Sequence, residues 1–171
     1  AAPLGINNSQ SVTVKLDERF DLAKGNQALT EAVMYGAHDP NGLPVYGGGG
    51  ATAPSYFVRA DTKTAQGSPL RIFCGPAIVL SMDGSSGAMR VVEDGEFACN
   101  HHALVLTPKQ KRGNYLHLFA QQAQSRLKLL ASNQSASSTL TMGMVESLEV
   151  TMPSETSLAR TLDKTIAELQ M

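Results

Sequence analysis

The chain of 171 residues is long enough for one domain that buries its own core without disulfide or metal cross-links. With 42% hydrophobic and 17% charged residues, it is neither an intrinsically disordered chain nor coiled coil throughout. A net charge of -1 at pH 7 argues against a free-standing nucleic-acid binder, which is usually basic. Two cysteines are too few for a disulfide framework and indicate a reduced, cytoplasmic protein. No apolar stretch reaches the roughly 18 residues that cross a bilayer, so we expect no membrane partner.

The first two thirds of the sequence predict short strands separated by turns. The expected strands cover residues 12–16, 20–24, 43–46, 55–60, 70–73, 77–82 and 88–92, and one or two more lie within 96–106. Residues 27–36 are compatible with a helical turn, and Asp39-Pro-Asn-Gly42 is typical of a tight turn. Strands that recur about every ten residues with glycine-rich turns favour a β-rich body.

Helices follow Pro108. Residues 115–130 carry apolar side chains at helical spacing, with Asn114 as the expected N-cap, and a strand at 147–152 precedes Pro153 and a last helix. In this helix Ala159, Leu162, Ile166 and Leu169 follow the 3-4-3 spacing of a heptad. Such a stripe fits either a partner helix or the chain's own domain. We therefore predict an α+β fold, a mixed, twisted β-sheet body with a few helices, plus a coiled-coil-like C-terminal helical arm.

No catalytic or metal site emerges from the motifs. Cys99-Asn-His-His102, with Cys74, could bind zinc or form a nucleophilic Cys–His pair, but the paired-cysteine spacing of structural zinc sites is absent. Gly47–Gly50 lacks the Gly-Lys-Ser/Thr ending of a phosphate-binding loop. The carboxylates form no acid/base pair. We therefore expect no catalytic residue, no metal and no cofactor in this chain.

The charges are unevenly distributed along the chain. Residues 97–145 contain no Asp or Glu, and residues 40–82 contain only Asp61. The acids gather near the N-terminal strand, at residues 93–96 and in the last 26 residues. A locally basic body of this kind is compatible with a surface that faces phosphates, and equally with ordinary solvated lysines.

Several segments, taken in order, resemble a target-recognition domain of the specificity (S) subunits of type I restriction-modification systems, a module shared with type IIB and IIG enzymes. The segments are Val14–Gly25 with its Lys-Gly ending, Leu43-Pro-Val-Tyr-Gly-Gly48, the Gly-rich turn within Ile78–Val91, Gly95–Pro108, Tyr115-Leu116, and the strand, proline and helix of Leu148–Leu169. A Glu-Gln pair is usual shortly after the proline, whereas here Glu155 is followed by Thr156 and Ser157.

The resemblance implies a non-catalytic DNA target-recognition domain over residues 1–152 and the start of a spacer helix over 153–171. Such a domain reads one half of a bipartite site in double-stranded DNA. It works with methyltransferase and restriction subunits or fused domains, and the methyltransferase binds S-adenosylmethionine and flips the target adenine. The helix would join a second recognition domain or a second copy. The chain would be a full subunit, half of a two-domain S protein or part of a fused enzyme.

The resemblance also implies roles for individual residues. Phosphates would be contacted by Lys24 (beside Gly25), Lys109, Lys111 and Arg112. The loop Gly47, Gly48, Gly49 and Gly50 and the turn at 83–87 would line the groove, with base or sugar contacts from Tyr46, Ser85, Ser86, Arg90 and His102. The helix contacts would come from Ala159, Leu162, Ile166 and Leu169. The alternative is a β-rich module that binds a small molecule or carbohydrate and has no DNA function.

Overall fold

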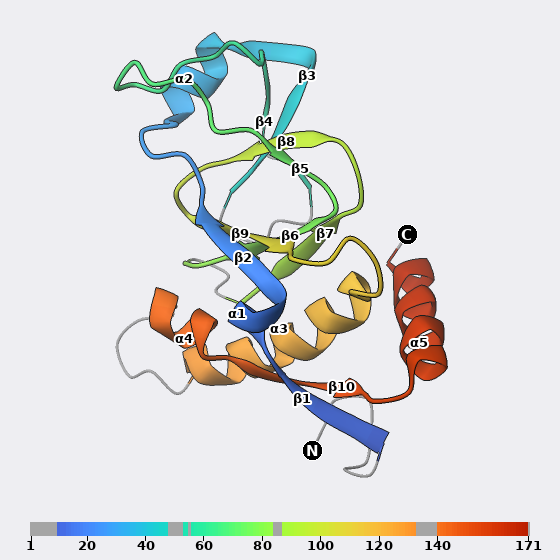
Figure 1. Ribbon diagram of the computed structural model, residues 1–171. Helices are drawn as coiled ribbons and strands as arrows, with labels where there is room; N and C mark the ends of the chain where they lie inside the picture. Colours follow the sequence, from blue (N-terminus) through green and yellow to red (C-terminus); the bar gives the residue numbers. More distant parts are fainter. Residues whose placement is uncertain (1–9, 48–52, 55, 84–86, 133–139, 171) are drawn as a thin grey trace.

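The strands and helices of the computed structural model stack in layers (Figure 1), and the structure describes residues 10–47, 53–54, 56–83, 87–132 and 140–170. In chain order the elements are β1 (Ser11–Lys15), α1 (Leu16–Arg19), β2 (Phe20–Lys24), α2 (Glu31–Gly36), β3 (His38–Tyr46), β4 (Tyr56–Val58), β5 (Phe73–Cys74), β6 (Ala77–Ser81), β7 (Met89–Val92), β8 (Glu96–Cys99), β9 (Ala103–Pro108), α3 (Leu116–Ser132), α4 (Met142–Glu146), β10 (Glu149–Pro153) and α5 (Thr156–Leu169). The predicted α+β class is confirmed. No helix in the described ranges is long and apolar enough to cross a membrane.

The central layer is an antiparallel sheet in the order β2-β9-β6-β7. Its inner strands are apolar at nearly every position because both faces are covered. In β6, Ile78 and Leu80 point to one core, whereas Ala77 and Val79 point to another. This alternation follows from the two-residue period of a strand, and it explains why these segments lack a polar face.

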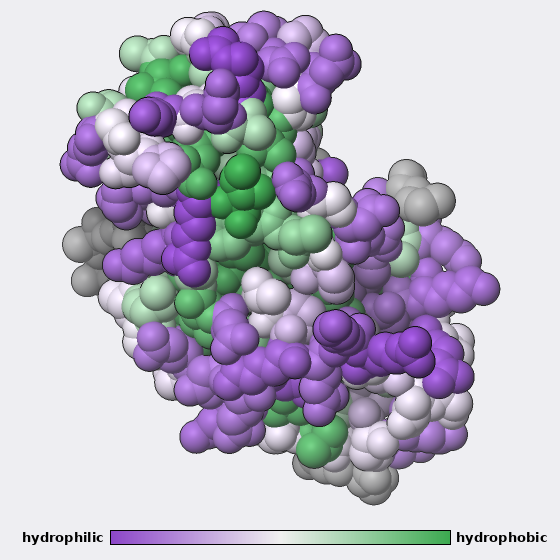
Figure 2. Space-filling view, turned by 45° about the horizontal axis from the view of Figure 1, so that its top comes forward, coloured by the Kyte–Doolittle hydropathy of each residue, from purple (hydrophilic) through white to green (hydrophobic). Residues whose placement is uncertain are grey.

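A second sheet, in the order β4-β3-β8-β5, lies against one face of the central sheet. Phe73 and Phe97 pack between the sheets with ring centroids 5.7 Å apart. On its far face, α2 closes a third cluster through Met34, and β4 contributes Val58. Figure 2 shows hydrophobic side chains in the middle of one face of the molecule, between the lobe with α2 and the part with α5.

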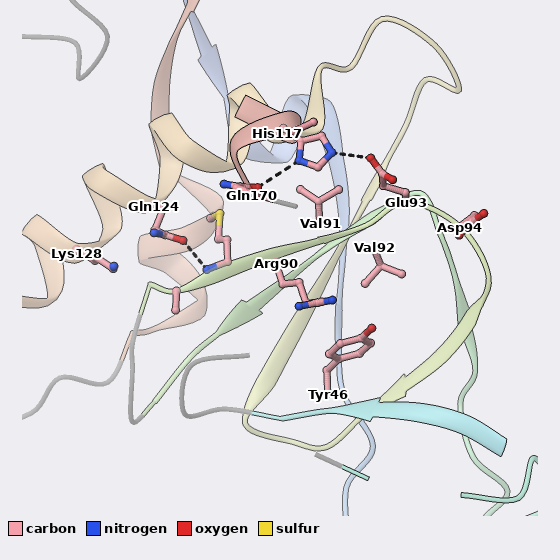
Figure 3. A pocket seen from close by; sticks show the side chains of 13 residues that line it. Tyr46, Arg90, Val91, Val92, Glu93, Asp94, His117, Gln124, Lys128 and Gln170 are labelled. Atoms are coloured by element: carbon pink, nitrogen blue, oxygen red, sulfur yellow. Dashed lines mark hydrogen bonds and ion pairs between the residues drawn. The ribbon is translucent and has the colours of Figure 1, made fainter. Parts of the chain in front are cut away.

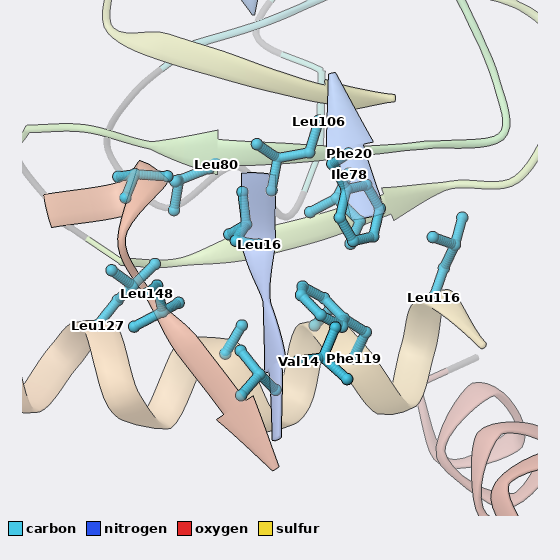
Figure 4. Packing of buried hydrophobic residues seen from close by; sticks show 14 of the residues in the cluster. Val14, Leu16, Phe20, Ile78, Leu80, Leu106, Leu116, Phe119, Leu127 and Leu148 are labelled. Atoms are coloured by element: carbon cyan, nitrogen blue, oxygen red, sulfur yellow. The ribbon is translucent and has the colours of Figure 1, made fainter. Parts of the chain in front are cut away.

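Helix α3 and the pair β1–β10 cover the other face of the central sheet (Figure 4). Phe20 of β2 meets Phe119 of α3 with ring centroids 4.7 Å apart. Leu16, Leu106 and Leu127 are fully buried in the same cluster. The largest core of the domain therefore forms where one amphipathic helix meets a sheet, as the helical spacing of residues 115–130 predicts.

The prediction of a turn at Asp39-Pro-Asn-Gly42 is wrong, because these residues lie inside β3. The pairing of β3 with β4 shifts register between His38 and Leu43, and Asn41 donates its backbone N–H to the Asp39 carboxylate at 3.0 Å. A Cβ on Gly42 would overlap the Val58 carbonyl. The turn-forming residues therefore make a bulge, which keeps the strand going while it bends.

The C-terminal helix α5 packs across the first turn of α3 (Figure 1) and is not a free arm. Ala159 and Ile166 are only 2% and 6% exposed and belong to the main core, and Leu162 is half-buried against it. Leu169 is 81% exposed. The expectation that all four residues form one stripe for a partner helix is therefore corrected. The chain's own core buries Ala159 and Ile166 and partly buries Leu162, so these side chains are not free to contact a partner.

The prediction that Asn114 caps α3 is also wrong. Asn114 donates its side-chain amide to the Gln110 carbonyl, whereas the Leu118 N–H in the first turn of α3 donates to the Asp163 carboxylate of α5 at 3.0 Å. A carboxylate at this position satisfies a free N–H and interacts favourably with the helix dipole. The cap of α3 thus comes from 45 residues further along the chain.

We expect Asp163→Ala to lower the free energy of unfolding by about 1 kcal/mol, because the first turn of α3 loses its cap. Thermal or urea unfolding measures the change. Glu168→Ala, at an exposed position of the same helix, is the control and should leave stability nearly unchanged. Equal effects of the two changes would contradict a capping role.

Candidate nucleic-acid interface

One end of the central sheet brings together four of the segments singled out above. Lys24 at the end of β2 is opposite Leu104, and Ser81 at the end of β6 is opposite Ala103. The turn 100–102 between β8 and β9 lies between them, and the backbone N–H of Asn100 donates to the Tyr46 carbonyl at the end of β3 at 3.1 Å. Among the described residues at this end of the sheet, 22–26, 45–47, 81–83 and 100–103, Asp83 is the only acid.

The two described glycines at this end, Gly25 and Gly47, pack closely against Asn100. Gly25 and Gly47 are both buried beside Asn100. A Cβ on Gly25 would overlap the Asn100 carbonyl, and a Cβ on Gly47 would lie 2.7 Å from the Asn100 side-chain nitrogen. The Asn100 backbone therefore requires glycine at position 25, and Gly47 packs against the Asn100 side chain. Backbone packing accounts for both glycines, and their DNA contacts stay predictions.

We expect Gly25→Ala to lower the free energy of unfolding by about 1–3 kcal/mol, because the new methyl group displaces the 100–102 turn. Gly36→Ala is the matched control: no atom lies within 4 Å of a Cβ there, so stability should not fall. Chemical denaturation measures both changes. An unchanged midpoint for Gly25→Ala would show that the turn is not held as described.

Tyr46 and Arg90 form a pair at the same end of the sheet. Tyr46 is buried and meets Phe97 edge-on at 5.7 Å, while the guanidinium carbon of Arg90 lies 5.4 Å from the centre of the Tyr46 ring. The buried Arg90 Nε has no hydrogen-bond partner among the described residues. Tyr46 is thus a platform that orients Arg90, and Arg90 keeps a donor that no described residue satisfies.

A cleft of about 680 Å³ begins at this pair and runs along the edge strand β7 between α3 and α5 (Figure 3). Gln124 closes one part of the strand edge by accepting from the Met89 N–H at 2.8 Å. At the far end, His117 Nε2 lies 2.8 Å from the Glu93 carboxylate and Nδ1 lies 3.4 Å from Gln170 Oε1. These contacts tie α3 to both ends of β7 and link the start of α3 to the end of α5.

His102 makes the most specific polar contact of the interface. Its Nδ1 lies 2.8 and 2.9 Å from the two carboxylate oxygens of Asp83, and this pair joins the β8–β9 turn to the end of β6. The His101 ring packs beside the His102 ring at 3.9 Å between centroids. Both members of the His102–Asp83 pair are about two-fifths exposed, so a ligand can reach them.

The other predicted phosphate contacts lie at the opposite end of the sheet. Lys109 follows Pro108, which is opposite Phe20, so five residues of β9, or about 17 Å, separate it from the position of Lys24. Lys111 and Arg112 continue in the exposed loop that follows. Lys109 also shares a cleft with Glu18. The structure therefore divides the predicted cations between two ends.

Sequence reasoning missed Lys128 as a member of the first group. A Cβ on Gly87 would lie 3.2 Å from the Lys128 backbone nitrogen, so the exposed end of α3 reaches the β6–β7 turn. A basic residue about three turns along an amphipathic helix carries no local signal for this position. The predicted contacts of Gly48, Gly49, Gly50, Ser85 and Ser86 lie outside the described residues.

The Cys–His alternative finds no support in this geometry. Cys99 is fully buried, and burial raises the pKa of its thiol to about 12, although a backbone hydrogen bond to Tyr46 opposes the shift. A nucleophilic thiol needs a lowered pKa. Within the described ranges, no group of three or more His, Cys, Asp or Glu side chains is placed to hold a metal ion.

Residues 8–170 match the family described as Type I restriction modification DNA specificity domain. The chain therefore belongs to this family, whose members are recognition modules and not catalytic subunits. The resemblance drawn from the sequence motifs is confirmed.

The fold is that of solved S subunits. The type I restriction-modification S subunit from M. genitalium has a TM-score of 0.69 at 18% identity, over 98% of this chain and 41% of that chain. The HsdS subunit from Thermoanaerobacter tengcongensis has a TM-score of 0.64 at 16% identity, over 98% and 39%. A structure describing complex assembly and conformational transition of the type I R-M system contains a chain with a TM-score of 0.62 at 15% identity, over 98% and 42%. The chain thus spans about two fifths of each, and no curated protein matches it.

Proposed function

We propose that this domain reads one half of a bipartite site in double-stranded DNA with the end of the central sheet that carries Lys24, Arg90, His102 and Lys128. The observation that carries the proposal is the gathering of these cationic and donor groups at one end, where the one acid of the neighbouring turns is already engaged by His102. Lysines there would fix the register on phosphates, and Arg90 would read a base edge, as arginine commonly does with guanine.

The proposal includes partners. S subunits similar to this chain are more than twice its length, and one belongs to a structure that describes assembly of the whole system. We infer that this domain works beside a second recognition domain or a second copy, and docks methyltransferase and restriction subunits or fused domains. The methyltransferase partner, not this chain, would bind S-adenosylmethionine.

Helix α5 offers a surface for that assembly beside its buried stripe. Leu158, Leu162, Thr165 and Leu169 follow one another at intervals of four, three and four residues, which aligns them along one side of the helix. They are half-buried or exposed. This second stripe replaces the predicted one as the surface for a partner helix.

Selection from a randomised duplex library, with the chain reconstituted with its methyltransferase partner, tests the proposed function. We expect a bipartite word, of which this domain sets one half, and affinity that falls with salt. Selection of no word would remove the DNA proposal. Arg90→Gln should weaken binding by about 1–3 kcal/mol and relax the preference at one position of the word.

A further inference from the structure

We propose that Asp83 determines which base His102 accepts, because it sets the tautomer of the imidazole. A carboxylate can only accept hydrogen bonds, so the contact of 2.8–2.9 Å places the proton on His102 Nδ1. In the neutral ring Nε2 is then a hydrogen-bond acceptor. Among the described residues none bonds to Nε2, and the side chain is 43% exposed.

The backbone holds both residues in place for this role. The His102 N–H donates to Asn100 Oδ1 at 3.0 Å, and the His102 carbonyl accepts from the Met82 N–H at 3.0 Å. The Asp83 carbonyl accepts from the Ser81 hydroxyl at 2.9 Å. Both turns thus orient the ring. The conformational entropy lost in fixing it is part of folding and is not lost again when a ligand binds.

An acceptor at Nε2 has a defined preference in the major groove. It can take a hydrogen bond from the amino group of adenine or cytosine, whereas guanine offers only acceptors there. This inference rests on the proposed function, since it assigns a base preference to one position of the DNA word. Asp83 acts through His102 and is therefore a positioning residue.

Asp83→Asn is the decisive change. The asparagine amide can donate its NH₂ to Nδ1 as well as accept there, so the proton is no longer held on Nδ1, and in the Nε2–H form the outer atom becomes a donor. We expect the preferred base at one position of the selected word to change, with roughly 10-fold discrimination, while the other positions stay the same. Asp94→Asn, an equally conservative change at an exposed carboxylate in the β7–β8 turn, is the control and should leave the word unchanged.

Imidazole ¹⁵N NMR of the free chain reads the tautomer without DNA. We expect the Nδ1–H form in the wild type and the Nε2–H form in Asp83→Asn, with the unfolding midpoint verifying that the variant is folded. A tautomer that switches while the selected word stays the same would overturn the inference and leave the DNA proposal standing. An Nε2–H form in the wild type would also overturn it. If the wild type selects no word, the DNA proposal fails, and the base preference fails with it.

Discussion

Replacing Ile166 with aspartate is expected to lower the free energy of unfolding by more than about 3 kcal/mol, or to prevent folding. Ile166 is 6% exposed in the core between α5 and α3, so the change removes apolar burial and places a charge within a cluster of hydrophobic side chains. Circular dichroism and chemical denaturation measure the loss. This is the effect of a core position, not of a surface for a partner.

Leu169→Asp is the matched control on the same helix. Leu169 is 81% exposed, so we expect the unfolding midpoint to stay within about 0.5 kcal/mol of the wild type. Self-association or docking of partner subunits, measured by analytical ultracentrifugation, should weaken because the second stripe gains a charge. If Ile166→Asp leaves stability unchanged as well, α5 does not pack on α3 in solution, and the original partner-helix interpretation returns.

Removing two lysines from one end of the central sheet should weaken DNA binding much more than removing two from the other. The double change Lys24→Gln and Lys128→Gln takes two exposed cations from the proposed interface. Since each phosphate contact releases counterions, we expect the slope of log affinity against log salt to fall by about 2, with weaker binding to all sequences alike. Fluorescence anisotropy on a duplex containing the selected word measures both quantities.

Lys109→Gln with Lys111→Gln is the control, because it removes the same charge from exposed positions about 17 Å away. We expect the salt slope and the affinity to stay close to the wild type. The reverse result, with the larger loss from Lys109 and Lys111, would move the interface to the other end of the sheet. Equal losses of affinity for the two double variants would show that DNA contacts both ends of the sheet.

The strands of the body could be predicted because burial leaves a local signature. Phe20–Lys24 coincides with β2, and the apolar runs at 77–82 and 96–106 became strands that are covered on both faces. The bulge at 39–42 could not be predicted, since the same residues favour a tight turn when read locally. What makes them continue as a strand is the neighbouring Val58, which contacts Gly42 from β4.

The sequence by itself determined the class of fold, the order of its strands and the family, because periodicity and motif order are properties of neighbours along the chain. The tertiary structure alone decided which residues share a surface. It placed Lys24 and Lys109 at opposite ends, brought Lys128 to the first end, and packed Gly25 against the Asn100 backbone. It also supplied the cap of α3 from Asp163 and the partner of His102 from Asp83. These pairings depend on antiparallel register and helix docking across 19 to 80 residues of chain, which no local pattern encodes.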